Sequence, residues 1–149
     1  MNALQKTYGK NFQIIGIPSN QFGKQEPGRN GTEILNTLKH VRPGDGFEPI
    51  FPLVLKRDVN GKDEDPLYTY LKASCPPVDD IFYTDEPGIY YKPFRNSDVR
   101  WNFEKFLINK KGRPIFRYPT RMIPSELIKD IEQLLKEDGG ASSSSSRSP

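Results

Sequence analysis

The sequence predicts an α/β layered fold, with a parallel strand near the start of the chain and an antiparallel hairpin near its end. Three observations favour this class. The continuous apolar run at 12–17 has the pattern of a strand buried on both faces. Apolar residues recur at helical spacing in several segments around it. Two Phe- and Ile-rich runs within 101–118 flank a Lys-Lys-Gly turn, which is typical of a hairpin.

Amphipathic helices are predicted on both sides of the run at 12–17. The first ends near Gly9 and has apolar residues at i, i+3 and i+7, namely Met1, Leu4 and Tyr8. The second begins with Asn30 as its N-cap and Glu33 as the capping-box partner three residues later. It ends at the Pro- and Gly-rich segment 42–49. Its apolar stripe comprises Ile34, Leu35, Leu38 and Val41.

The second half of the chain starts with a short helix, which Asp65 caps and which has Pro66 at its first position. Residues 76–100 are expected to be irregular. A final helix begins near Pro124 and ends at Gly139–Gly140, with a buried stripe of Ile123, Leu127, Ile131, Leu134 and Leu135. We expect one domain over 1–137 and a disordered Ser-rich tail over 138–149.

Composition excludes several functional classes. The net charge is only +3, and acidic and basic residues are interleaved, so no nucleic-acid partner is expected. No apolar run approaches the ~18 residues of a membrane span. The first residues lack the apolar stretch of a signal peptide. The single cysteine excludes an internal disulfide framework and a multi-cysteine zinc site.

Other candidate sites have simpler interpretations. The acidic segment 58–65 resembles a calcium loop, but Gly61 stands fourth and position 12 is Thr69, so no metal site is predicted. Cys75 lacks a CxxC partner and is interpreted as a packing thiol. His40 is expected on the surface at a helix C-terminus. The hairpin carries basic and aromatic residues that could suit nucleic acid, but alternation along its strands and the Lys-Lys-Gly turn explain them without a partner.

Three neutral donors form the most informative candidate site. Gln21 lies in a polar loop directly after the run at 12–17, and Trp101 and Asn102 open the hairpin. An indole offers one N–H donor and each amide offers two. Such donors suit a thiolate or selenolate and the charge that develops on a departing hydroxide. The sequence therefore predicts donors that serve a nucleophile supplied elsewhere.

Four motifs resemble those of the glutathione peroxidases in order and spacing. They are "IPSNQFGKQEPG" (17–28), "LKHVRPGDGFEP" (38–49), "DVNG" (58–61) and "RWNFEKFLI" (100–108). The resemblance spans 1–137 and implies a thioredoxin-like fold that reduces hydrogen peroxide and organic hydroperoxides with glutathione. It implies Gln21, Trp101 and Asn102 as catalytic residues that converge on one position. Glutathione-binding arginines would be Arg42 and Arg121, although Thr120 replaces the first member of a common Arg-Arg pair.

The departures from the family pattern are equally specific. No residue matches the peroxidatic selenocysteine or cysteine, which the family carries upstream of the matched segment. The first core strand of the family fold also has no counterpart, so we expect a slot between 12–17 and 102–108. No cofactor is implied besides glutathione as co-substrate. The alternative is a non-catalytic thioredoxin-fold protein that acts in binding or as a scaffold.

The resemblance also suggests assembly and compartment. The loop 41–49 resembles that of the tetrameric members, and Phe47 and Pro49 give it an apolar projection. A homotetramer is therefore expected for the full-length form. "LKASCPP" (71–77) looks most like the secreted branch, which suggests an extracellular protein, with a cytoplasmic one as the alternative.

Overall fold

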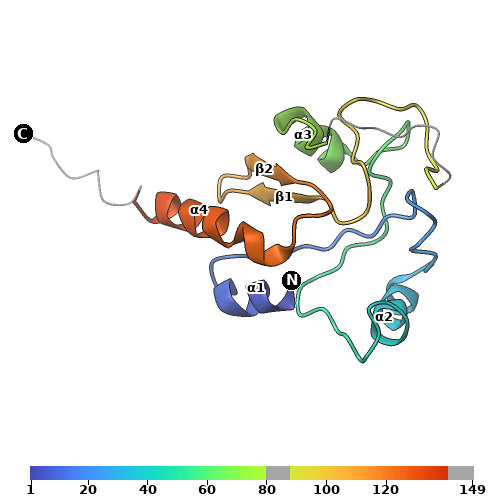
Figure 1. Cartoon of the computed structure of the whole chain (residues 1–149), viewed down its shortest axis with the longest axis horizontal. Helices are drawn as coiled ribbons and strands as arrows, with labels where there is room; N and C mark the ends of the chain where they lie inside the picture. Colours follow the sequence, from blue (N-terminus) through green and yellow to red (C-terminus); the bar gives the residue numbers. More distant parts are fainter. Residues whose placement is uncertain (80–87, 141–149) are drawn as a thin grey trace, which may run out of the picture.

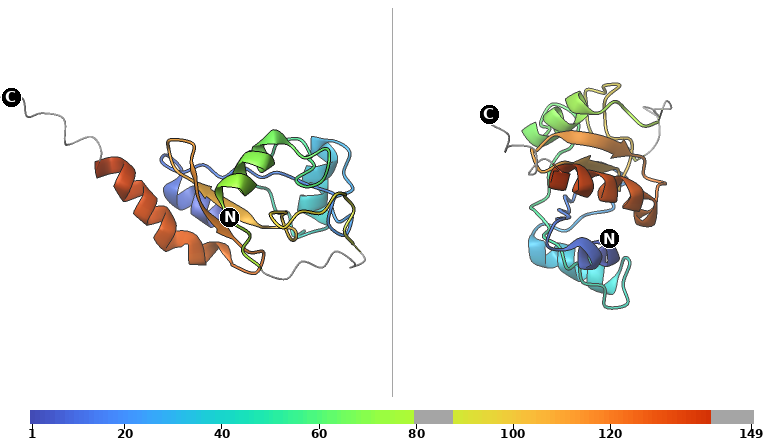
Figure 2. Two further views of the ribbon diagram at one scale, coloured as in Figure 1. Left: turned by 90° about the horizontal axis from the view of Figure 1, so that it is seen from above. Right: turned by 90° about the vertical axis from the view of Figure 1, so that its left-hand side faces the viewer.

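The computed structural model describes residues 1–79 and 88–140, with the backbone alone at 138–140. Its elements are α1 (Asn2–Tyr8), α2 (Gly31–His40), α3 (Pro66–Ser74), β1 (Lys105–Ile108), β2 (Pro114–Tyr118), the 3-10 helix η1 (Pro124–Leu127) and α4 (Ile128–Gly140). Figure 1 shows the β1–β2 hairpin between α3 and α4, with α1 below α4 and α2 at a distance from the sheet. The right-hand view of Figure 2 shows α3 and α4 on opposite faces of the hairpin. The α/β layered class is therefore confirmed.

The predicted helix starts are confirmed by their caps. Asn30 Oδ1 accepts a hydrogen bond from Glu33 N at 3.0 Å, and Asn30 Nδ2 donates to Glu33 Oε1 at 3.2 Å. Asp65 Oδ1 accepts from Leu67 N at 2.9 Å, and Pro66 occupies the first turn of α3. The bonds from Glu33 N and Leu67 N satisfy backbone N–H groups that a helix start leaves without intrahelical partners.

The predicted hairpin is also confirmed. β1 and β2 pair antiparallel, with Lys105 opposite Tyr118 and a register shift after Leu107. Gly112 adopts φ 78° in the turn and donates its N–H to Asn109 O at 2.9 Å. A positive φ costs little at glycine, so the Lys-Lys-Gly sequence suits this turn.

Two hydrophobic clusters lie on the two faces of the hairpin. Strand alternation sends Leu107 into one cluster and Phe106 into the other. The first cluster joins α1, α4 and the hairpin through Leu4, Ile14, Leu107, Tyr118, Leu127, Ile131 and Leu134. The second lies toward α3 and consists of Phe22, Val59, Tyr91 and Val99, with Trp101 and Phe106 packed against it.

The prediction of a strand buried on both faces at 12–17 is wrong. Ile14 is buried, but Ile15 is 57% exposed, and Gly16 alone forms a parallel bridge, to Leu53. The bridge uses Gly16 N to Pro52 O at 2.9 Å and Val54 N to Gly16 O at 3.0 Å. The segment therefore pairs with 52–54 and not with the hairpin. Pairing along one edge does not cover the two faces of an extended chain, and Ile15 is therefore left exposed.

No backbone hydrogen bond joins 12–17 to 102–108, and both segments are fully described. A small pocket of about 40 Å³ lies between their ends and α4. Its lining includes Phe12, Leu107, Asn109, Ile131 and Leu135. The two segments are therefore not paired with each other as neighbouring strands.

Two predicted apolar stripes are only partly buried. In α2, Ile34 is buried, but Leu35 is exposed and Val41 is 73% exposed, because α2 lies away from both clusters (Figure 1). At the last helix, Ile123 is 58% exposed because it precedes η1 in extended backbone. Helix α4 ends at Gly140, as predicted for Gly139–Gly140. The predicted tail lies outside the described residues from 141 onward, while 138–140 belong to α4.

Candidate functional site

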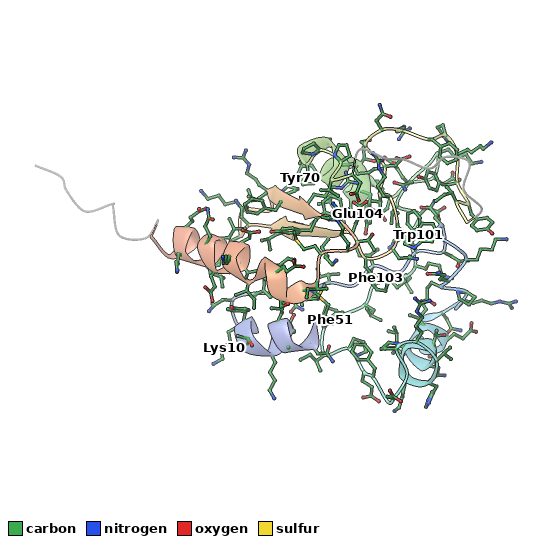
Figure 3. All side chains as sticks on the ribbon, in the orientation of Figure 1. Lys10, Phe51, Tyr70, Trp101, Phe103 and Glu104 are labelled. Atoms are coloured by element: carbon green, nitrogen blue, oxygen red, sulfur yellow. The ribbon has the colours of Figure 1, made fainter. Side chains whose placement is uncertain are left out.

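Two segments far apart in the sequence meet at the edge of the second cluster. The Trp101 ring lies 5.8 Å from the Phe22 ring, centroid to centroid, at 47°. Asn102 Nδ2 donates to Phe22 O at 3.4 Å across 80 residues. Figure 3 labels Trp101, Phe103 and Glu104 on the segment that enters β1, with Trp101 on the side away from α4. The structure therefore brings Trp101–Asn102 against the residue that follows Gln21.

The carboxamide of Gln21 is buried and points toward residues 59–60. Its Oε1 accepts from Val59 N at 2.9 Å and from Asn60 N at 3.0 Å. Its Nε2 donates to Asn60 O at 2.8 Å. Two backbone donors can face only an oxygen, so they fix which end of the amide is Nε2. One hydrogen of Nε2 is used by Asn60, and the second has no hydrogen bond among the described residues.

The two other predicted donors differ in their partners. Asn102 Nδ2 also donates to Gln25 Oε1 at 3.0 Å, so the second glutamine of the loop holds this amide. The half-buried Trp101 makes no indole hydrogen bond within the part of the chain that the structure describes. A Cβ on Gly88 (φ 123°) would lie 3.2 Å from Trp101 Cη2, so glycine lets the backbone approach the ring closely. Among the described residues, the Trp101 indole N–H is therefore available as a donor.

Buried polar contacts hold the segment 97–104, which carries Trp101 and Asn102. Asn60 Nδ2 donates to Val99 O and Asn60 Oδ1 accepts from Val99 N, both at 2.9 Å. Arg117 of β2 pairs with Glu104 at 2.7 Å, with both side chains about 1% exposed. Arg117 also donates to the carbonyl oxygens of Ser97 and Asp98. The site is therefore supported by a buried polar network.

Lys72 of α3 lies at the centre of this network. Its Nζ is within 3.1 Å of Val59 O, Asn60 Oδ1, Glu64 Oε2 and Asp98 Oδ1. Burial raises the pKa of Glu64, but hydrogen bonds from Lys72 and Thr69, together with the charges of Lys72 and Arg95, outweigh burial and leave that pKa lowered. Sequence reasoning missed this network, although the "DVNG" motif at 58–61 contains one of its members, Asn60.

The two predicted glutathione-binding arginines are both exposed, and Thr120, next to Arg121, donates to Asn102 O at 2.7 Å. Arg42 is exposed just after α2, and its backbone N–H donates to Thr37 O at 2.9 Å. The Arg121 side chain is 72% exposed and forms an ion pair with the Asp79 carboxylate. No hydrogen bond or ion pair joins either arginine to Gln21, Trp101 or Asn102 in the described residues.

The remaining candidates from the sequence have structural roles. Cys75 is buried at the end of α3, and burial raises the pKa of its thiol, so it is a packing residue as predicted. His40 is the exposed last residue of α2, also as predicted. In the acidic segment, Asp58 and Asp63 are exposed as expected for a turn. Asn60 instead is about 1% exposed, because its side chain belongs to the buried network.

Comparison with known proteins defines the family. The family model described as glutathione peroxidase matches residues 1–72. Glutathione peroxidase 3 of Mus musculus is 46% identical over 144 residues, which are 95% of this chain and 62% of that protein. Glutathione peroxidase 2 of Homo sapiens is 48% identical over 139 residues, 91% of this chain and 73% of that protein. The chain therefore belongs to the glutathione peroxidase family.

Solved structures support the same fold. The crystal structure of T. cruzi GPX1 matches with a TM-score of 0.60 and 25% identity, over 91% of this chain and 68% of that one. The crystal structure of Trgpx in apo form matches with a TM-score of 0.56 and 28% identity, over 90% and 64%. The fold is thus the thioredoxin-like fold of this family. In the described residues, no helix has the length and apolarity that crossing a bilayer needs.

Proposed function

We propose that this chain serves a glutathione peroxidase reaction, in which hydrogen peroxide or an organic hydroperoxide is reduced by glutathione. Family membership and one observation carry the proposal. The observation is that Trp101 and Asn102 pack against Phe22, which follows Gln21. This contact supports the proposal that donors from segments remote in sequence act at one position.

In the proposed reaction a selenolate or thiolate attacks one peroxide oxygen and the O–O bond breaks. The departing alkoxide or hydroxide takes up a proton, and the nucleophile becomes a selenenic or sulfenic acid. One glutathione displaces water from that acid, and a second releases glutathione disulfide and restores the nucleophile. Cys75 is buried with a raised thiol pKa, so we assign the nucleophile to a residue outside these 149.

The chain's own residues would stabilise charge around that nucleophile. The donors without a hydrogen bond to any described residue are the N–H of Trp101 and the second Nε2 hydrogen of Gln21. Asn102 would have to exchange its bond to Gln25 Oε1 for one to the nucleophile. Loss of one such donor typically costs about 10²–10³ in rate.

We assign glutathione binding to Arg42 and Arg121, because guanidinium groups pair well with carboxylates. Arg121 would exchange the Asp79 carboxylate for a glutathione carboxylate. The exposure of this pair favours such an exchange, since an exposed ion pair is typically worth only ~0–1 kcal/mol.

We further infer that the missing first core strand, supplied by residues outside these 149, fits between 12–17 and β1. The absence of backbone hydrogen bonds between these fully described segments supports it.

We also infer a homotetramer that uses the loop 41–49. Positive φ angles at Gly44, Asp45 and Gly46 define the shape of this loop, and Phe47 and Pro49 are half-buried on it. A monomer by light scattering at micromolar concentration would contradict the tetramer.

NADPH consumption coupled to glutathione reductase tests the function. A protein that extends this chain upstream through the nucleophile should reduce hydrogen peroxide with glutathione. The 149-residue chain alone should show no turnover above the background thiol reaction. If the extended protein binds its partners but shows no turnover, the non-catalytic alternative stands. Turnover by the short chain that Cys75→Ser abolishes would make Cys75 the nucleophile.

A further inference from the structure

We infer that Asn60 is a positioning residue that sets Gln21 against the segment carrying Trp101 and Asn102. Its backbone holds the Gln21 carboxamide through Asn60 N to Oε1 at 3.0 Å and Nε2 to Asn60 O at 2.8 Å. Its side chain holds the backbone of Val99, two residues before Trp101, through two bonds of 2.9 Å. One residue thus bridges both sides of the proposed donor set.

The bridge is rigid because the Asn60 amide has only one workable orientation. Its Oδ1 accepts from Lys72 Nζ at 3.0 Å and from Val99 N, while its Nδ2 faces Val99 O. Exchange of the two ends would oppose Nδ2 to an ammonium and an N–H, and would oppose Oδ1 to a carbonyl. Lys72 Nζ also holds Val59 O at 3.1 Å, so the backbone that receives Gln21 is held at two successive residues.

Burial makes these bonds necessary for the local structure. Asn60 is about 1% exposed and Asp98, beside Lys72, is 0% exposed. A buried polar group that loses its partner has no water to replace it, so the backbone must move to find one. A change at the Asn60 side chain should therefore shift residues 59–60 relative to Val99, and Gln21 with them.

For the site, the Asn60 bridge determines where the second hydrogen of Gln21 Nε2 points. Because Val59 N and Asn60 N both point at Gln21 Oε1, Nε2 has one bonded hydrogen and one that no described residue accepts. Only the use of that hydrogen by a nucleophile rests on the proposed function. The bridge itself does not depend on it.

The test replaces Asn60 with an isosteric residue in the 149-residue chain. Asn60→Asp keeps the acceptor for Lys72 and Val99 N but removes the donor to Val99 O. Asn109→Asp is the matched control, because Asn109 Oδ1 also accepts from two backbone N–H groups, in the hairpin turn. Leu134→Ala, in the first cluster, controls for a general loss of stability. If Asn60→Asp does not fold, Asn60→Ala is measured instead, since it adds no charge.

Two readouts report the two sides of the bridge. Hydrogen exchange of the Gln21 side-chain amide, followed by NMR, reports residues 59–60. Fluorescence of Trp101, the single tryptophan of the chain, reports the other side. Asn60→Asp should speed Gln21 exchange by about ten- to hundredfold and shift Trp101 emission to longer wavelength. The two control variants should leave both signals unchanged at a matched folded fraction.

Equal Gln21 exchange and equal Trp101 emission in Asn60→Asp and Leu134→Ala would overturn the inference. In the extended protein with its nucleophile, Asn60→Asp should lower kcat while KM for glutathione stays unchanged. If that protein has no peroxidase activity before any substitution, the proposed function fails. The exchange and fluorescence results would still decide the role of Asn60.

Discussion

Replacing Lys72 by Met should strongly destabilise the fold. Lys72 Nζ lies 2.6 Å from Glu64 Oε2 and 3.1 Å from Asp98 Oδ1, and the Lys72 and Asp98 side chains are 4% and 0% exposed. Met has a similar volume but no charge. The variant would leave the buried Asp98 carboxylate without its cation, while Glu64 would keep only its longer ion pair with Arg95 at 3.4 Å.

Removing one partner of a buried ion pair typically costs about 3–5 kcal/mol. Part of that cost is relieved here, because Glu64 keeps its bond from Thr69 and Asp98 Oδ2 keeps its bond from Arg95 N. We therefore expect a loss of about 3 kcal/mol, the low end of the range. Against a typical stability of about 5–15 kcal/mol, that loss is large.

Urea unfolding followed by Trp101 fluorescence measures the loss. Lys39→Met is the matched control, because Lys39 pairs with Glu48 at 2.5 Å on the exposed surface and should cost less than about 1 kcal/mol. Adding Asp98→Asn to Lys72→Met should recover part of the stability, since it removes the buried charge that lost its cation. Equal unfolding midpoints for Lys72→Met and Lys39→Met would refute the reasoning.

Three further predictions concern the core, the thiol and acid. Ile131 is 1% exposed in the first cluster, so Ile131→Ala should lower the free energy of unfolding, measured in urea, by about 2–5 kcal/mol. A loss below about 1 kcal/mol would show that the cluster is not packed as described. Cys75 should react with iodoacetamide only after urea unfolds the chain, since burial raises the pKa of its thiol, and rapid labelling without urea would contradict this. The lowered pKa of Glu64 stabilises the fold above the usual carboxyl value of 4.5, and that contribution should be lost as pH falls below it. The urea midpoint should therefore fall on acidification, and less steeply in Glu64→Gln; equal slopes would exclude Glu64 as a cause.

Local features were predictable from the sequence because their signals lie within a few residues. Asn30 caps the N–H of Glu33 three residues later, the Glu33 carboxylate accepts from Arg29 N, and Asp65 precedes Pro66 at the start of α3. The Lys-Lys-Gly turn likewise fits its hairpin.

The run at 12–17 shows where local sequence patterns stop predicting structure. Its apolar pattern predicted burial on both faces, but burial depends on which segments pair with it.

The site was predictable only in part. Family motifs indicated Gln21, Trp101 and Asn102, and the structure brings their segments into contact. The partners of the Gln21 carboxamide lie 38 and 39 residues away along the chain, and no local pattern encodes such contacts. Lys72 was equally hidden, since lysine is almost never fully buried unless paired, and its partner Asp98 is 26 residues away.

Turnover by a Trp101→Phe variant tests the central claim most directly. In the extended protein with its nucleophile, this change removes the one indole N–H while it keeps an aromatic ring against Phe22. Glutathione-dependent reduction of hydrogen peroxide should fall by about 10²–10³ in kcat/KM for the peroxide. Phe103→Leu, at an exposed neighbour, should leave the rate unchanged. A Trp101→Phe rate within threefold of the native rate, with the fold intact, would contradict the assignment of Trp101 as a donor to the nucleophile.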